Sequence, residues 1–127
     1  MSPTGYLLDS HILLWIDGEP QRFVGTPLQH VLAHSSVYVS AATAWELAIK
    51  LASNKLNLPV LVSKMAVSYG FSELLITFQH VELAAGLPFH HRDPFDRLLV
   101  AQAIVEGLIL VTSDKRLVEY RVPILLI

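Results

Sequence analysis

The chain has 127 residues, a formal net charge of −2 and no cysteine. This length suits one domain with one core, spanning residues 1–127. Disulfides and thiolate metal sites are excluded, and the mildly acidic balance argues against binding nucleic acid by bulk charge. No uncharged apolar run reaches the ~18 residues of a membrane helix, and the N-terminus lacks a signal-peptide pattern, so we expect a cytoplasmic protein without membrane contact.

Short apolar strands are predicted to alternate with helices along the chain. The strands are expected at residues 5–8, 37–39, 72–76, 108–112 and 122–127. The helices are expected at residues 11–15, 20–35, 41–51, 60–68, 81–85, 94–106 and 114–118. Pro59 is expected to open the helix at 60–68 and Gly70 to close it, while Ser40 is typical of an N-cap.

Strands that are continuous apolar runs between helices are typical of a parallel sheet covered on both faces. We therefore predict an α/β fold in three layers, with a central, mostly parallel sheet of four to five strands and helices on both sides. In such sheets, ligands bind beyond the carboxyl ends of the strands.

Four acidic residues are expected near that edge of the sheet. Asp9 follows the first strand, Glu46 lies in the second turn after the second strand, and Asp114 follows the fourth. Asp96 lies in the first turn of a helix whose surrounding positions are apolar, so its carboxylate should sit beside the packed interior. Carboxylates crowded in this way repel one another by several kcal/mol unless a cation neutralises them. Oxygen ligands without cysteine favour Mg²⁺ or Mn²⁺.

Each acid also has a purely structural explanation. Asp9 and Asp114 could be N-caps, and Asp96 could belong to a capping pair. Glu46 could bond Lys50 at i+4. Only the joint placement of the four acids favours a metal site over these local explanations.

Four sequence blocks carry a family resemblance. They are residues 7–15 (LLDSHILLW), 39–50 (VSAATAWELAIK), 91–103 (HRDPFDRLLVAQA) and 111–114 (VTSD). In content and order they resemble the PIN-domain ribonucleases, and specifically the VapC-type toxins of bacterial toxin–antitoxin pairs. The resemblance implies a PIN-like fold, metal-dependent endonucleolytic cleavage of RNA, a homodimer, and a cognate antitoxin protein that covers the acidic groove.

The resemblance also assigns residues. It places the family's acids on Asp9, Glu46, Asp96 and Asp114, and its hydroxyl near the last acid on Thr112 or Ser113. Ser10 stands where relatives often have threonine, which keeps a hydroxyl at that position.

A mechanism follows from both lines of reasoning, as a hypothesis. Asp9 and Asp96 would bind Mg²⁺ or Mn²⁺ directly, and Asp114 would hold that ion or a second one through water. Glu46 would orient or deprotonate the attacking water.

Two basic residues and one further acid allow two interpretations. Lys50 and Arg97 could neutralise the scissile phosphate, or they could pair with Glu46 and Asp93 respectively. Asp93 could be a metal ligand, but Pro94 directly after it favours an N-cap. His90 and His91 are expected at the mouth of the site, where they could contact a phosphate, although a solvated loop is favoured.

Three other classes compete with the nuclease hypothesis. A phosphoryl-accepting signalling domain needs paired acids early in the chain, and a phosphatase of the haloacid dehalogenase type needs Asp-x-Asp, whereas Asp9 is followed by Ser10 and His11. The third class is a catalytically silent RNA-binding or scaffold domain with the same PIN fold. A nuclease assay with and without EDTA separates all three from the metal-dependent endoribonuclease.

Overall fold

The computed structural model describes residues 5–57 and 61–127. Its strands form one sheet in the order β3-β2-β1-β4-β5, and each neighbouring pair is parallel. The strands are β1 (Tyr6–Leu8), β2 (Val37–Ser40), β3 (Ser72–Leu74), β4 (Ile109–Thr112) and β5 (Ile124–Leu126). The prediction of a parallel α/β sheet is confirmed.

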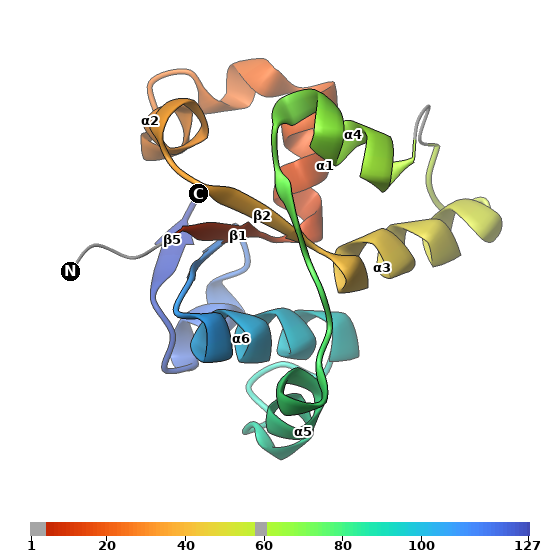
Figure 1. Cartoon of the computed structure of the whole chain (residues 1–127), viewed down its shortest axis with the longest axis vertical. Coiled ribbons are helices and arrows are strands. Elements are labelled where there is room, and N and C mark those ends of the chain that lie inside the picture. Colours follow the sequence, from red (N-terminus) through yellow and green to blue (C-terminus); the bar gives the residue numbers. More distant parts are fainter. Residues whose placement is uncertain (1–4, 58–60) are drawn as a thin grey trace.

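Helices cover both faces of this sheet (Figure 1). One face carries α1 (Ser10–Gly18), α2 (Pro27–His34), α3 (Ala41–Ala52) and α4 (Val62–Tyr69). The other carries α6 (Pro94–Glu106), against which α5 (Phe78–Gly86) packs. Two short 3₁₀ helices, η1 (Pro20–Phe23) and η2 (Lys115–Glu119), complete the described elements. None of the helices within residues 5–57 and 61–127 combines the length and apolar character needed to cross a membrane.

The hydrophobic core lies on both sides of the central strands. Leu7 and Leu8 of β1 are completely buried. Successive residues of a strand point to opposite faces, so Leu8 packs in the cluster that includes Ile12 and Leu47, whereas Leu7 packs with Leu99 of α6. The three layers predicted from the apolar strands are therefore present.

Two predicted helices differ from the observed ones. The helix expected at residues 20–35 is divided into η1 and α2. Gly25, between them, has a φ of 81°, and Pro27 begins the second helix and disfavours helical geometry at the residue before it. The short helix expected at 81–85 is longer, because Thr77 caps its start with the side chain of His80 in the place where a capping box usually has Glu or Gln.

The remaining elements agree with the predicted ones to within a few residues at each end. The segment expected as helix at 114–118 forms the 3₁₀ helix η2, one residue further on. The predicted helix start at Pro59 lies outside the described residues.

The sheet order decides where the acids meet. β1 lies between β2 and β4, and the three strands are parallel, so their carboxyl ends share one edge. Asp9 follows β1 directly, α3 begins where β2 ends, and Asp114 follows β4. Asp9, Glu46 and Asp114, separated in the chain by 37 and 68 positions, are therefore brought to one edge of the sheet.

Candidate active site

Asp9 is fixed by the neighbouring strand β4. Its backbone N–H donates to the carbonyl of Val111 at 2.9 Å. Its carboxylate caps α1, with Oδ1 accepting the His11 N–H at 3.4 Å, and its Oδ2 accepts the hydroxyl of Thr112 at 2.6 Å. Thr112 is completely buried, and its oxygen also accepts the N–H of Asp114 at 3.0 Å. Of the two hydroxyls considered from the sequence, Thr112 is the one that joins the two acids.

Glu46 projects from α3 towards Asp9 and is nearly buried. Its Oε1 accepts the hydroxyl of Ser10, and its Oε2 accepts Lys50 Nζ at 3.1 Å. The i+4 pairing considered for Lys50 is thus present. Ser10 orients the Glu46 carboxylate, which gives the hydroxyl after the first acid a definite task.

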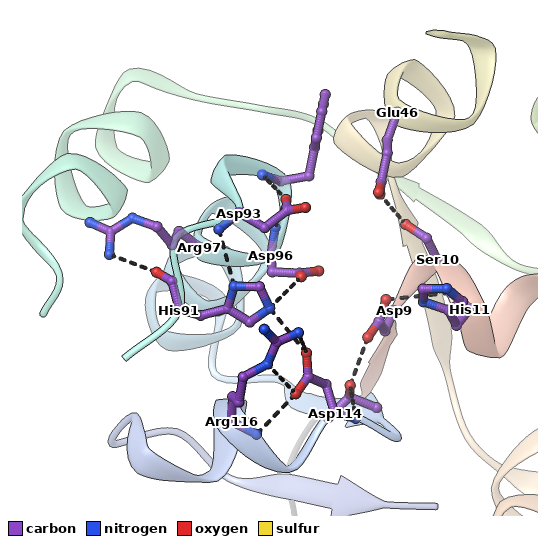
Figure 2. A network of polar contacts seen from close by, with 12 residues as sticks. Asp9, Ser10, His11, Glu46, His91, Asp93, Asp96, Arg97, Asp114 and Arg116 are labelled. Carbon is purple, nitrogen blue, oxygen red and sulfur yellow. Dashed lines mark hydrogen bonds and ion pairs between the residues drawn. The ribbon is translucent and has the colours of Figure 1, made fainter. Parts of the chain in front are cut away.

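Asp93 and Asp96 begin α6. Asp93 Oδ1 accepts the N–H groups of Phe95 at 2.8 Å and of Asp96 at 3.2 Å, so the N-cap interpretation is confirmed. Asp96, one turn further on, points out of the helix towards Asp9 and Ser10 (Figure 2). The space between Asp96 on one side and Asp9 and Ser10 on the other is the opening of the site.

The carboxylates act on one another electrostatically. The pKa of Asp96 is raised from an ordinary value of 3.8 to about 8, first by burial and then by the charges of Asp9, Asp93, Glu46 and Asp114 in that order. Asp96 therefore carries a proton at neutral pH when no cation is present. A cation held among these oxygens would displace that proton.

Asp114 has the opposite electrostatic environment. Its Oδ1 accepts the N–H of Arg116 at 2.9 Å and Nε at 3.1 Å, and its Oδ2 accepts Nη2 at 2.9 Å. These hydrogen bonds, together with the weaker contribution of the bond with His91, lower the pKa of Asp114 to about 2. The contact of Arg116 with Asp114 was not predicted from the sequence. The one indication of it was that Arg116 lies two positions after Asp114, an acid at the expected start of a helix.

His91 was expected in a solvated loop, and this expectation is wrong. Its side chain is buried, and its Nε2 lies 3.0 Å from Oδ2 of Asp96 and 3.0 Å from Oδ2 of Asp114. Its backbone N–H donates to the hydroxyl of Tyr120 at 3.1 Å. Among the described residues, the side chains of His91, Asp96 and Asp114 form the group whose possible ligand atoms all lie within 4.8 Å of one another.

Arg97 is held away from the acids. Its guanidinium is buried and donates, at 2.9 Å each, to the backbone carbonyls of Ala84, Leu87 and Pro88. Within the described ranges it forms no ion pair with Asp93, so that predicted pairing is wrong. The reason is geometric: a residue one position after Asp96 points about 100° away from it, towards the loop before α6.

The donor set fits a hard divalent cation. The available ligands are carboxylate oxygens, and Asp96 Oδ1 accepts no hydrogen bond from any residue in the described ranges. In the part of the chain that the structure describes, lysine or arginine pairs with two of these four carboxylates: Lys50 with Glu46 and Arg116 with Asp114. The surplus negative charge, seen in the raised pKa of Asp96, is what Mg²⁺ or Mn²⁺ would neutralise.

Known proteins are similar to this chain in sequence and in fold. The PIN domain family matches residues 6–123. Ribonuclease VapC22 of Mycobacterium tuberculosis (strain ATCC 25618 / H37Rv) is 36% identical over 124 residues, which cover 94% of this chain and 95% of that protein.

Two solved structures show the same architecture at lower identity. A toxin–antitoxin complex from Klebsiella pneumoniae is similar with a TM-score of 0.69 and 19% identity, over 95% of this chain and 96% of that chain. VapBC2 from Rickettsia felis, bound to a DNA fragment from their promoter, is similar with a TM-score of 0.64 and 17% identity, over 94% of this chain and 96% of that chain. These two likenesses establish a common fold. Because the family match and the mycobacterial relative each span almost all of the sequence, the chain belongs to the PIN-domain family.

Proposed function

We propose that this protein is a metal-dependent endoribonuclease, the toxin of a toxin–antitoxin pair, which hydrolyses phosphodiester bonds in RNA. The observation that carries the proposal is the placement of Asp9, Glu46, Asp96 and Asp114 at one edge of the sheet, where the charges of the other acids add to burial in raising the pKa of Asp96 to about 8. A fold gains no stability from such crowding, whereas a cation-dependent reaction requires it. The ribonuclease name of the mycobacterial relative supports RNA as the substrate.

We propose Mg²⁺ or Mn²⁺ as the cofactor, with Asp9, Asp96 and Asp114 as its ligands. When bound, such an ion supplies positive charge that stabilises the phosphorane-like transition state and lowers the pKa of the attacking water. Thr112 fixes the orientation of the Asp9 carboxylate, because the Thr112 hydroxyl donates to Asp9 Oδ2. Asp114 already accepts four hydrogen bonds, which suits a ligand that acts through water.

Glu46 is the proposed general base. Ser10 and Lys50 each donate to one of its two oxygens, so the carboxylate has a fixed orientation and remains able to accept the proton of the attacking water. Lys50 and the largely exposed Arg116 are the cations from which a scissile phosphate can receive hydrogen bonds. Arg97 is not assigned this task, because backbone carbonyls occupy its guanidinium.

A cleavage assay on a mixed RNA pool tests the proposal. We expect cleavage with Mg²⁺ or Mn²⁺, none with EDTA, and none with Asp96→Asn. Asp17→Asn is the matched control, because Asp17 is an acid that bonds Tyr69 and takes no part in the cluster. Cleavage that persists in EDTA, or with Asp96→Asn, would contradict the metal-dependent mechanism. RNA binding without cleavage under every ion would favour a catalytically silent PIN domain.

We also propose a cognate antitoxin protein as partner, acting with the toxin in the cytoplasm. The solved relatives include a toxin–antitoxin complex, and an apolar groove of about 310 Å³ lies between α3 and α4, lined in part by Leu47, Leu51 and Leu61. Leu61→Asp should prevent co-purification with a co-expressed antitoxin and leave RNA cleavage intact. Val24→Asp, at an equally exposed position outside the groove, is the control. Co-purification unaffected by Leu61→Asp would place the antitoxin elsewhere.

A homodimer is the proposed assembly. Large apolar side chains are exposed between β3 and α5, with Leu75 64% and Phe78 86% exposed, and a second copy of the chain would cover them. Light scattering on the purified protein should give twice the mass of one chain. Phe78→Asp should give the mass of a single chain, and a monomeric wild type would contradict the proposal.

A further inference from the structure

One N–H group lies between two carboxylates of the acidic cluster. The Nε2 atom of His91 is 3.0 Å from Oδ2 of Asp96 and equally 3.0 Å from Oδ2 of Asp114. Figure 2 shows the imidazole ring edge-on to both acids, on the side of the cluster away from Asp9. The three residues come from the loop before α6, from its first turn and from the loop after β4.

The other nitrogen of the ring fixes the position of the proton. His91 Nδ1 accepts the backbone N–H of Asp93 at 3.0 Å. A ring nitrogen that accepts a hydrogen bond carries no proton, so the hydrogen-bond network assigns the proton of the ring to Nε2. Backbone amides hold their hydrogen permanently, and Asp93 is itself fixed as the N-cap of α6. The tautomer is therefore built into the start of this helix.

This tautomer prevents His91 from binding a metal ion in the observed arrangement. A histidine ligand must offer a nitrogen lone pair. The lone pair of Nδ1 faces the Asp93 amide, and Nε2 carries the proton. The proximity of His91, Asp96 and Asp114 thus resembles a three-residue metal site, but only the two carboxylates can be ligands.

Asp96 keeps an oxygen for an ion while His91 lies against it. His91 Nε2 contacts Oδ2 of Asp96, and Oδ1 of Asp96 accepts no hydrogen bond within residues 5–57 and 61–127. The free oxygen lies on the side facing Ser10 and Asp9 (Figure 2). Hydrogen bonds from outer residues to ligating carboxylates orient the ligands, and their loss weakens metal binding by roughly 10- to 100-fold.

We propose that His91 is a positioning residue for the metal site: its Nε2–H donates to Oδ2 of Asp114 while the same nitrogen lies against Oδ2 of Asp96, so that the ring sets the separation of the two carboxylates and is not itself a ligand. The inference rests on the proposed metal-dependent function and concerns the same site. Its test uses metal binding and spectroscopy, so it does not depend on finding the RNA substrate.

The experiment uses untagged full-length protein and Mn²⁺ alone. Electron paramagnetic resonance of free Mn²⁺ gives the affinity, and pulsed measurements on the bound ion detect ¹⁴N of a directly coordinated imidazole. We expect no such nitrogen coupling in the wild type, and Mn²⁺ binding at least about 10-fold weaker in His91→Ala. His90→Ala is the matched control, because His90 packs its ring edge against Tyr120. It should bind Mn²⁺ like the wild type.

The outcomes separate this inference from the proposed function. A ¹⁴N coupling that disappears in His91→Ala would make His91 a ligand and overturn the inference alone. Unchanged Mn²⁺ affinity in a folded His91→Ala protein would overturn it too. If His91→Ala does not fold, His91→Phe keeps the ring volume without either nitrogen and takes its place. A wild type that binds no Mn²⁺ would overturn both this inference and the proposed cofactor.

Discussion

Helix α6 contributes to two polar clusters, each built around a buried histidine. At its start, Asp96 meets His91; further along, Gln102 and Glu106 meet His80 of α5. The two histidines are held alike, since each accepts a backbone N–H on Nδ1 at 3.0 Å and directs Nε2 to carboxylate oxygen. The local chemistry of the histidine is therefore the same in both places.

The clusters differ in what surrounds the histidine. His80 meets one carboxylate, that of Glu106 at 2.7 Å, and Gln102 bonds the Ser40 hydroxyl at 2.6 Å and the Leu75 carbonyl at 3.3 Å. Its polar groups are satisfied, and its single carboxylate is 40% exposed and therefore hydrated. His91 instead stands before two carboxylates, with further acids close by. The comparison teaches that a buried polar group alone does not indicate a functional site, whereas several carboxylates held close together make the acidic cluster the candidate.

The largest expected effect is the difference in RNA cleavage between matched substitutions of the carboxylates at the two ends of α6. Asp96→Asn should lower RNA cleavage by at least ~10²–10³-fold, the size found when one charge-stabilising group is lost, and so to below detection in the assay on the RNA pool. Glu106→Gln, the same kind of change beside the other histidine, should leave the cleavage rate unchanged. Initial rates with saturating Mg²⁺ measure both, and equal losses in the two variants would remove the distinction between the clusters.

A second effect concerns pH in the metal-free protein. The pKa of Asp96 is raised from 3.8 to about 8, so the folded protein holds a proton that the unfolded chain has released. The contribution of this protonated carboxyl to the free energy of unfolding is complete below pH 4 and is lost as the pH rises through 8. At ~1.4 kcal/mol per pKa unit, the loss amounts to a few kcal/mol. Urea unfolding in EDTA between pH 5 and 8.5 measures this loss.

Asp96→Asn is the control for that pH dependence. An asparagine does not titrate, so the decline in the free energy of unfolding should be much smaller in this variant, and Glu106→Gln should decline like the wild type. The same slope in wild type and Asp96→Asn would show that Asp96 is not the group responsible.

A smaller effect is expected in the balanced cluster. Gln102→Leu leaves the buried Ser40 hydroxyl and the Leu75 carbonyl without their partner, which costs about 1–3 kcal/mol of unfolding free energy. Cleavage by the folded protein should remain near the wild-type rate below its melting temperature. A loss of activity without a loss of stability would mean that this cluster also serves the reaction.

The smallest effect belongs to Lys50. Its ammonium pairs with Glu46 at 3.1 Å, but 40% of the Lys50 side chain is exposed. Exposed i,i+4 pairs contribute ~0.3–0.5 kcal/mol, so Lys50→Ala should change the free energy of unfolding by no more than that. If Lys50 also contacts the scissile phosphate, KM for RNA will rise in this variant while stability stays constant. Unchanged KM would leave the pairing with Glu46 as its only task.

The sheet and the acids at its edge could be predicted from the sequence because both are local patterns. Apolar runs define the strands, and Asp9 and Asp114 follow directly after two of them. The N-cap at Asp93 was equally readable, since Pro94 follows it. In each case, a few adjacent residues contain the physical cause.

The surroundings of His91 and Arg97 could not be predicted, because their partners are distant in the chain. His91 is buried by contacts with Asp114 and Tyr120, 23 and 29 residues further on. Arg97 bonds Ala84, 13 residues before it. The position of Arg97 next to Asp96 in the sequence suggested that its guanidinium could reach the scissile phosphate. The direction of the His91 and Arg97 side chains depends, however, on the packing of the loop before α6.

The bond between the Thr112 hydroxyl and Asp9 spans 103 positions of the chain. β1 therefore finds one of its two neighbours, β4, only after the ~100 residues between them have been made. A nascent chain on the ribosome carries Asp9 and Glu46 long before Asp114 and cannot assemble the complete set of acids until β4 has been made. The topology thus separates the synthesis of the first acids from the appearance of the acidic cluster.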